Sequence, residues 1–276
     1  MSKTIVITGA SDGIGAAAAR ELCRRGHEVI VVGRSAQKTE MVARAIGARF
    51  FVADFARLAD VRRLAAELDA ACPRIDVLAN NAGGVFGDRV TTVDGFETTF
   101  QVNHLAPFLL TCLLLDKLIA SKASVLQTSS IAARLASRLD IDDLNGERRY
   151  SPVTAYGNGK LANILFTREL HRRYHQRGIS AAAFHPGNVA SSFAAGSRSL
   201  IGFLLNTPLI RPLLMLITPD KGAEQLVWLA ETMPGPDWVS GAYYERHKPA
   251  KRENPKGLDP VLARQLWDRS GQMVGL

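Results

Sequence analysis

In this 276-residue chain, the residues best suited to proton transfer are a tyrosine and a lysine, Tyr156 and Lys160. They lie four residues apart. On a helix, side chains four residues apart lie one above the other on one face. A phenol titrates near pH ~10, and a cation one turn away favours its phenolate form. The spacing therefore predicts an acid/base tyrosine whose pKa the lysine lowers. The alternative is a half-buried tyrosine beside a lysine that extends to solvent.

An amphipathic helix is predicted from Lys160 onward. Apolar residues such as Leu161 and Leu165 recur at helical spacing, and Arg168 and Arg172 supply a polar face. A phenol pKa near ~7 needs roughly 4 kcal/mol of differential interaction, more than an exposed ion pair supplies. Such a site therefore needs a second positive charge and partial exclusion of water.

The first elements predict a phosphate-binding turn. The apolar run from 3 to 8 is typical of a buried parallel strand, the turn GASDGIG follows, and strong helix formers come next. Glycines allow close approach to a pyrophosphate, and the helix N-terminus attracts its charge. The turn residues expected to bind a dinucleotide are Gly9, Ser11, Asp12, Gly13, Ile14 and Gly15.

The second predicted strand, 28–34, ends in Gly33-Arg34 without an acidic residue. An acid at this point holds the adenosine ribose hydroxyls, whereas an arginine accommodates a 2′-phosphate. The sequence therefore favours NADP(H) over NAD(H). Alternatively, Arg34 stacks on adenine, which would serve both cofactors equally.

Strands and helices continue to alternate after this point. Further strands are predicted at 48–53, 74–79, 123–128, 179–184 and 241–244, and helices at 35–46, 57–71, 95–118, 221–231 and 260–269. This alternation predicts an α/β fold, a doubly wound parallel sheet of about seven strands flanked by helices. Ligands lie at the carboxyl ends of such strands. Polar or small residues stand there: Asp54, Phe55, Asn81, Ala82, Gly83, Ser129 and Ser130.

Asn103 occupies the middle of the predicted helix 95–118, where asparagine is disfavoured. It is either a solvent-facing amide or a break in the helix that holds water beside the site. Both alternatives remain open from the sequence.

The chain has a formal charge of +8 and a pI near 9.7. Its basic residues are spread over predicted surface helices, apart from a loose cluster at 246–256, so we expect no nucleic-acid partner. Anionic cofactors or membrane surfaces explain the charge as well. The three cysteines are scattered without metal-ligand spacing, and no secretion signal precedes the first strand. We therefore expect no metal site and a cytoplasmic protein.

These motifs together resemble the short-chain dehydrogenase/reductase family, over at least residues 3–189. They are TGASDGIG, NNAG, Asn103, Ser130, Tyr156-x-x-x-Lys160 and HPGNV, in this order. The run YGNGKLANILFTREL resembles its retinol-dehydrogenase-like branch. The resemblance implies a single NAD(P)-binding Rossmann domain over 1–276, assembled as a homodimer or homotetramer. It also implies cofactor contacts from Pro186, Gly187 and Val189.

The resemblance assigns four catalytic roles. Tyr156 is the acid/base, and Lys160 binds the nicotinamide ribose and lowers the pKa of the tyrosine. Ser130, the second of its pair, holds the substrate carbonyl, and Asn103 belongs to a proton-relay water chain. The chain departs from the family at Gly159, where Ser or Ala is usual. The threonine common after the family's PG-x-V is either displaced to Ser191 or absent.

The segment of about 190–220 corresponds to the family's substrate lid, and 200–217 is strongly apolar. Interrupting polar residues and prolines leave it short of the ~20 apolar residues of a membrane span. We expect a lipophilic small-molecule substrate, with weak association to a membrane surface as the alternative. The sequence thus predicts an enzyme that transfers hydride between NADP(H) and a carbonyl or alcohol. The competing hypothesis is a dinucleotide-binding sensor or scaffold without turnover.

Overall fold

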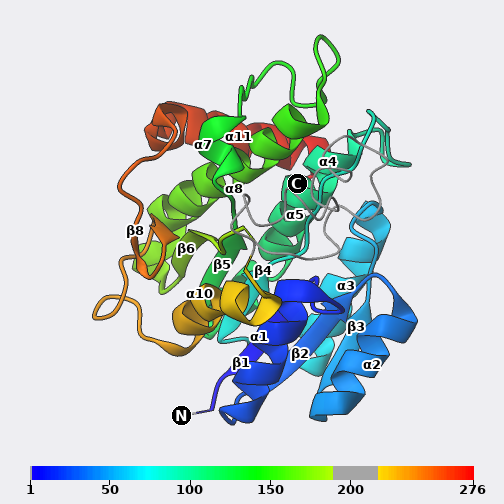
Figure 1. The fold of residues 1–276 in the computed structure, drawn as a ribbon, viewed down its shortest axis with the longest axis vertical. Helices are drawn as coiled ribbons and strands as arrows, with labels where there is room; N and C mark the ends of the chain where they lie inside the picture. Colours follow the sequence, from blue (N-terminus) through cyan, green and yellow to red (C-terminus); the bar gives the residue numbers. More distant parts are fainter. Residues whose placement is uncertain (1, 189–216) are drawn as a thin grey trace.

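The fold is described from a computed structural model, which places residues 2–188 and 217–276 (Figure 1). Val189 and most of the expected lid segment, 189–216, lie outside the described residues.

One eight-stranded sheet runs through the described chain in the order β3-β2-β1-β4-β5-β6-β7-β8. Its strands are β1 (Thr4–Thr8), β2 (Glu28–Gly33), β3 (Arg49–Val52), β4 (Val77–Asn80), β5 (Ser124–Thr128), β6 (Ser180–His185), β7 (Ala242–Glu245) and β8 (Lys248–Pro249). The first seven are parallel, as predicted, and the two-residue β8 adds an antiparallel edge. Strand order reverses between β1 and β4, which is where doubly wound sheets bind ligands.

Helices cover both faces of the sheet (Figure 1). The helices are α1 (Gly13–Arg24), α2 (Ala36–Ile46), α3 (Leu58–Ala71), α4 (Thr98–Phe100), α5 (Ala106–Leu113), α6 (Leu115–Ala120), α7 (Ala132–Leu135), α8 (Pro152–Tyr174), α10 (Pro219–Glu231) and α11 (Pro260–Val274). Short 3₁₀ turns span His175–Arg177 and Pro255–Leu258. Helices α1, α2 and α10 pack on one face, and α3, α5 and α8 on the other, with α11 against α8.

The strands in the middle of the sheet, such as β1, β4 and β5, are buried on both faces, whereas the edge strands β3 and β8 are partly or fully exposed. In β1, Ile5 and Ile7 belong to the core under α1 and α10, while Val6 belongs to the core under α3, α5 and α8. All three side chains have no exposed surface. Burial on both faces is typical of parallel strands between helical layers.

The single helix predicted at 95–118 is wrong. The chain forms α4, a π-helix at Gln101–Leu105, then α5 and α6. In the π-helix the Ala106 N–H donates to the carbonyl of Gln101, five residues back. Pro107 has no N–H to donate, so this stretch loses a regular helical bond. Asn103 lies in the π-helix and is fully buried, so it marks a break and not a solvent-facing amide.

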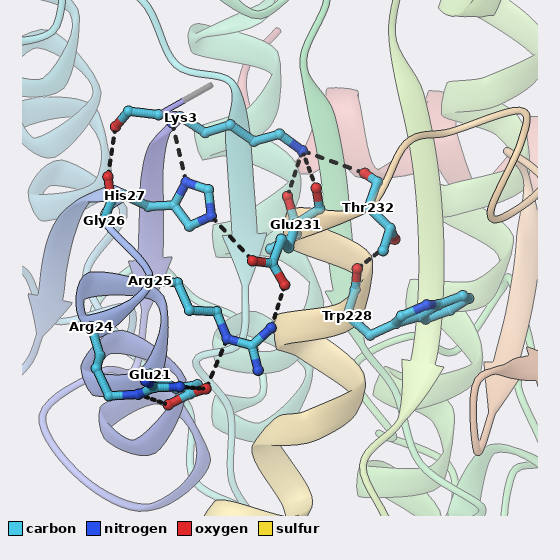
Figure 2. Close-up of polar contacts among 11 residues, drawn as sticks. Lys3, Glu21, Arg24, Arg25, Gly26, His27, Trp228, Glu231 and Thr232 are labelled. Atoms are coloured by element: carbon cyan, nitrogen blue, oxygen red, sulfur yellow. Dashed lines mark hydrogen bonds and ion pairs between the residues drawn. The ribbon is translucent and has the colours of Figure 1, made fainter.

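Helix α10, which follows the undescribed segment, is tied at its far end to the N-terminal elements (Figure 2). The Lys3 ammonium donates to the carbonyls of Ala230 and Glu231 at 2.8 and 2.9 Å. Arg25, at the end of α1, bonds the carboxylates of both Glu21 and Glu231. A cation suits the negative end of a helix, so these contacts fix α10 against α1 and β1.

Candidate active site

The turn after β1 forms a cradle closed against the other strand ends. Gly9 has a φ of +65°, which favours glycine, and a Cβ on Gly15 would lie 2.4 Å from the Gly9 carbonyl oxygen. Asp12 caps α1 by accepting a 2.7 Å hydrogen bond from the Gly13 N–H. The N–H groups of Ile14 and Gly15 donate to no group within the described residues. They are free to bind an anion at the helix N-terminus, so the turn fits a pyrophosphate.

Hydrogen bonds from Thr8 and Asn81 join three strand ends at this edge. The Thr8 hydroxyl accepts from the N–H groups of Asn81 and Ala82, each at 3.0 Å. The Asn81 amide donates to the Thr8 carbonyl at 3.0 Å, and its oxygen accepts from Thr128 at 3.2 Å. The ends of β1, β4 and β5 are therefore held in one fixed arrangement.

Asn103 projects from the π-helix toward the loop after β4. Its amide nitrogen donates to the carbonyls of Gly84 and Thr99, both at 2.8 Å, and its oxygen accepts from the Gly84 N–H. A Cβ on Gly83 would lie 2.5 Å from the Asn103 oxygen and 3.0 Å from the Lys160 nitrogen. A Cβ on Gly159 would lie 3.0 Å from the Asn103 Cβ, which gives a steric reason for glycine before the lysine.

Tyr156 and Lys160 both lie on α8, which begins at Pro152 and thus earlier than the sequence indicates. Lys160 is 1% exposed, and its ammonium donates to the Thr128 carbonyl at 3.0 Å. The ammonium lies 5.5 Å from the centre of the Tyr156 ring. The predicted pairing on one face of the helix is therefore present.

The two serines after β5 have different neighbours. The buried Ser129 hydroxyl donates to the Lys160 carbonyl at 2.7 Å, which fixes the backbone of α8. The Ser130 side chain hydrogen bonds Tyr156 and lowers its pKa in part. Ser130 is thus the serine of the pair that contacts the tyrosine.

The structure reverses the expected shift of the tyrosine pKa. Burial raises the pKa of Tyr156, and the hydrogen bond from Ser130 offsets only part of this rise. Burial also lowers the pKa of Lys160 from 10.5 to about 7. Desolvation disfavours the charged form of both groups, so burial weakens the ability of the lysine to stabilise a phenolate in the cofactor-free protein.

Arg34 is exposed directly after β2. A second exposed cation, Lys38, follows four residues later in the sequence. Lys38, one turn into α2, lies 3.4 Å from the Asp12 carboxylate, so it partly neutralises this acid in the cradle. A Cβ on Gly33 would lie 2.3 Å from the Thr39 hydroxyl and 2.8 Å from the Ser11 Cβ. Any side chain at position 33 would therefore displace the cradle.

The remaining predicted cofactor residues differ in their surroundings. The Asp54 carboxylate accepts from the Ala56 N–H at 3.0 Å, within its own turn. The Phe55 side chain is buried in the core, so only its backbone can face a ligand. Pro186 and Gly187 follow β6, and Gly187 has a φ of +94°. All remain predictions as cofactor contacts.

Sequence reasoning missed three residues of this site. Thr8 and Thr128 each follow an apolar strand pattern, and their role depends on partners from other strands. Lys38 stands in the predicted helix 35–46, four residues after Arg34, and nothing in its local pattern distinguishes it from an ordinary exposed lysine.

The short chain dehydrogenase family model matches residues 3–200. A candidate daunorubicin C-13 ketoreductase (DnrU) of Streptomyces sp. (strain C5) is 42% identical over 280 residues, covering 99% of this chain and 93% of that protein. Human retinol dehydrogenase 13 is 39% identical, with coverage of 99% and 85%. A solved short chain dehydrogenase from Shigella flexneri, complexed with NADP, is 27% identical with a TM-score of 0.63, over 83% of this chain and 90% of that one.

The chain belongs to the short-chain dehydrogenase family and is an oxidoreductase of that family. Its similarity to retinol dehydrogenases confirms the resemblance to the retinol-dehydrogenase-like branch.

The lowered pKa of Lys160 predicts a pH dependence of stability in the cofactor-free protein. Below pH ~7 the lysine is charged in both states, and folding carries the full cost of burying the charge. Between pH ~7 and ~10 the folded state binds fewer protons than the unfolded state, so stability rises with pH. From pH 7 to pH 9 the gain should reach about 2 kcal/mol.

This gain should disappear in Lys160→Met. Denaturant unfolding of parent and variant at both pH values measures it, since all other titrating groups are shared. An equal change in the two proteins would show that the Lys160 pKa is not lowered.

Proposed function

We propose that this protein transfers hydride between NADP(H) and the carbonyl or alcohol carbon of a lipophilic small molecule. The observation that carries this proposal is the convergence of Ser130, Tyr156 and Lys160, from β5 and α8, beside the turn that fits a pyrophosphate.

The cofactor, when bound, supplies the hydride and an oxidised nicotinamide with a positive charge. Tyr156 donates its proton to the carbonyl oxygen in the direction of reduction, and burial keeps that proton on the phenol beforehand. Ser130 hydrogen bonds the same oxygen. Lys160 binds the nicotinamide ribose and, once charged, stabilises the phenolate that remains.

Asn103 fixes the loop after β4 at the site. Its bonds to Gly84 and Thr99 hold the loop after β4 beside the lysine. We assign it the water-holding role in proton supply to Lys160.

The preference for NADP(H) rests on charge near the expected 2′-phosphate. Arg34 and Lys38 are both exposed at the start of α2, and Lys38 offsets the charge of Asp12. A guanidinium can bind a phosphate through two parallel hydrogen bonds. The NADP in the Shigella flexneri relative agrees with this preference.

The substrate class rests on two kinds of observation. One similar protein is named a ketoreductase and another a retinol dehydrogenase. The first name refers to a ketone and the second to an alcohol, which are the two functional groups of the proposed reaction. The apolar sequence at 200–217 favours a lipophilic molecule.

We further propose a homodimer or homotetramer, as the resemblance implies, and a cytoplasmic location, as the cysteines indicate. Its three cysteines are free thiols, Cys72 buried and the other two half-buried. Among the described helices, none has the length and hydropathy to span a membrane.

Replacing the proton donor tests the chemistry. Tyr156→Phe should lower kcat by ~10²–10⁴-fold, the usual contribution of general acid–base catalysis. Affinity for NADPH should change little. Tyr174→Phe, at the other end of α8, is the matched control and should keep the parent rate. The kcat values of both variants are measured by following NADPH absorbance with apolar aldehydes and ketones of graded size. A near-parental rate in Tyr156→Phe would remove the tyrosine from the mechanism.

Replacing Arg34 tests the cofactor preference. An acid at position 33 would disrupt the cradle, so the informative variant is Arg34→Leu. Losing a charge-assisted contact of ~1.5–3 kcal/mol should weaken NADPH binding roughly ten- to hundredfold and leave NADH nearly unchanged.

Arg44→Leu, an exposed arginine later in α2, controls for net charge. Fluorescence titration of both reduced cofactors into the three proteins gives the affinities. Equal losses for NADPH and NADH in Arg34→Leu would show that Arg34 stacks on adenine instead.

A further inference from the structure

The π-helix that carries Asn103 also holds two other buried polar residues, Gln101 and His104, and the partner of His104 lies on α11. His104 is 1% exposed, and its Nε2 lies 2.8 Å from the hydroxyl of Ser270 on α11. Ser270 is itself fully buried. A hydrogen bond between two buried side chains thus links the last helix of the chain to the turn beside the active site.

Aromatic side chains fix the His104 ring from several sides. The ring centre lies 5.2 Å from that of Phe100, 6.1 Å from Phe108 and 6.3 Å from Phe166. Burial lowers the pKa of His104 to about 3, so the imidazole is neutral at ordinary pH. A neutral imidazole still hydrogen bonds through both ring nitrogens, and a side-chain hydrogen bond joins this ring to Asn163 on α8 as well.

A π-turn inside a helix is rare because it sacrifices regular hydrogen bonds, and its position must be fixed by other contacts. Here the turn is held by polar side chains whose partners lie on separate elements, and Gln101 also anchors it by donating to Phe55 and Asp94. Asn103 bonds Gly84 and Thr99 on the cofactor side, and His104 bonds Ser270 on the α11 side. Without the contact to Ser270, the turn loses its polar anchor on α11, and the Asn103 amide is held less firmly beside Lys160.

We propose that His104 and Ser270 are positioning residues, which hold the π-turn so that the Asn103 side chain stays in its place beside Lys160. The C-terminal helix α11 is thereby part of the catalytic framework, although it contributes no group to the cofactor cleft in the described chain. This inference rests on the proposed function.

A double-mutant cycle in kcat tests this dependence on Asn103. The variants are Asn103→Ala, His104→Phe and the two combined. Phenylalanine keeps the aromatic packing and removes the polar contacts of the imidazole to Ser270 and to Asn163. Since small misplacements of catalytic groups cost up to ~100-fold, His104→Phe should lower kcat between about 5- and 50-fold. In the Asn103→Ala background it should lower kcat by less than about twofold, because the group it positions is gone.

Cofactor affinity provides the second measurement. His104→Phe should bind NADPH with the parent affinity, because its contacts lie outside the glycine turn. Ser270→Ala, which deletes only a hydroxyl, should reproduce the same cycle and serves if His104→Phe fails to fold. Val29→Ala, a buried change on β2, controls for stability loss and should keep the parent kcat in the folded protein.

The outcomes distinguish failure of the positioning role of His104 and Ser270 from failure of the proposed hydride-transfer function. If the losses of Asn103→Ala and His104→Phe multiply in an active protein, or if both His104→Phe and Ser270→Ala keep the parent kcat, the positioning role is wrong and the proposed function stands. A parent chain that binds NADPH but reduces no carbonyl overturns the proposed function, and the positioning role with it.

Discussion

The burial of a lysine ammonium is the constraint on which the rest of the site depends. Lys160 is 1% exposed and has the Thr128 carbonyl as its acceptor among the described residues. Burying a charge with so few partners is costly, and the lowered pKa of Lys160 expresses this cost. Burial therefore weakens the preference of the lysine for its charged form, and acceptors from a bound ligand would restore it. This couples the charge state of the catalytic pair to cofactor binding.

Close packing around the lysine follows from this burial. Glycines at 83 and 159 leave room for the Asn103 side chain, and Ser129 fixes the α8 backbone at Lys160. The π-turn at 101–105 brings Asn103 to this space, and α11 supports the turn from behind. The same packing explains why this chain has glycine before the lysine, where the family usually has serine or alanine.

Most of the fold could be predicted from the sequence, because parallel strands buried on both faces give continuous apolar runs, as in β1 and β2. The break at 101–105 could have been predicted from Pro107 together with Asn103, since neither suits a helix interior. The site was harder to predict where it depends on distant partners. Nothing local in the sequence shows that Thr8 bonds Asn81, or that Ser270 bonds His104.

The direction of the pKa shifts could not be predicted from spacing. The four-residue interval correctly placed Tyr156 near Lys160, but the sign depends on solvent exclusion, which only the packed structure reveals. Likewise, the absence of an acid at Gly33 has a steric cause in Thr39 and Ser11, which lie elsewhere in the sequence. The closeness of Tyr156 and Lys160 was thus predictable from their spacing, whereas the direction of their pKa shifts was not.

Isotope transfer tests the central claim, hydride transfer at this site, most directly. NADPH deuterated at either hydrogen of its hydride-bearing carbon is incubated in single turnover with the apolar carbonyl compounds, and the alcohol products are examined by mass spectrometry. The account predicts that one of the two labelled forms delivers a single deuterium to the former carbonyl carbon. Product alcohol without deuterium from either form, or no product from any carbonyl, would contradict it.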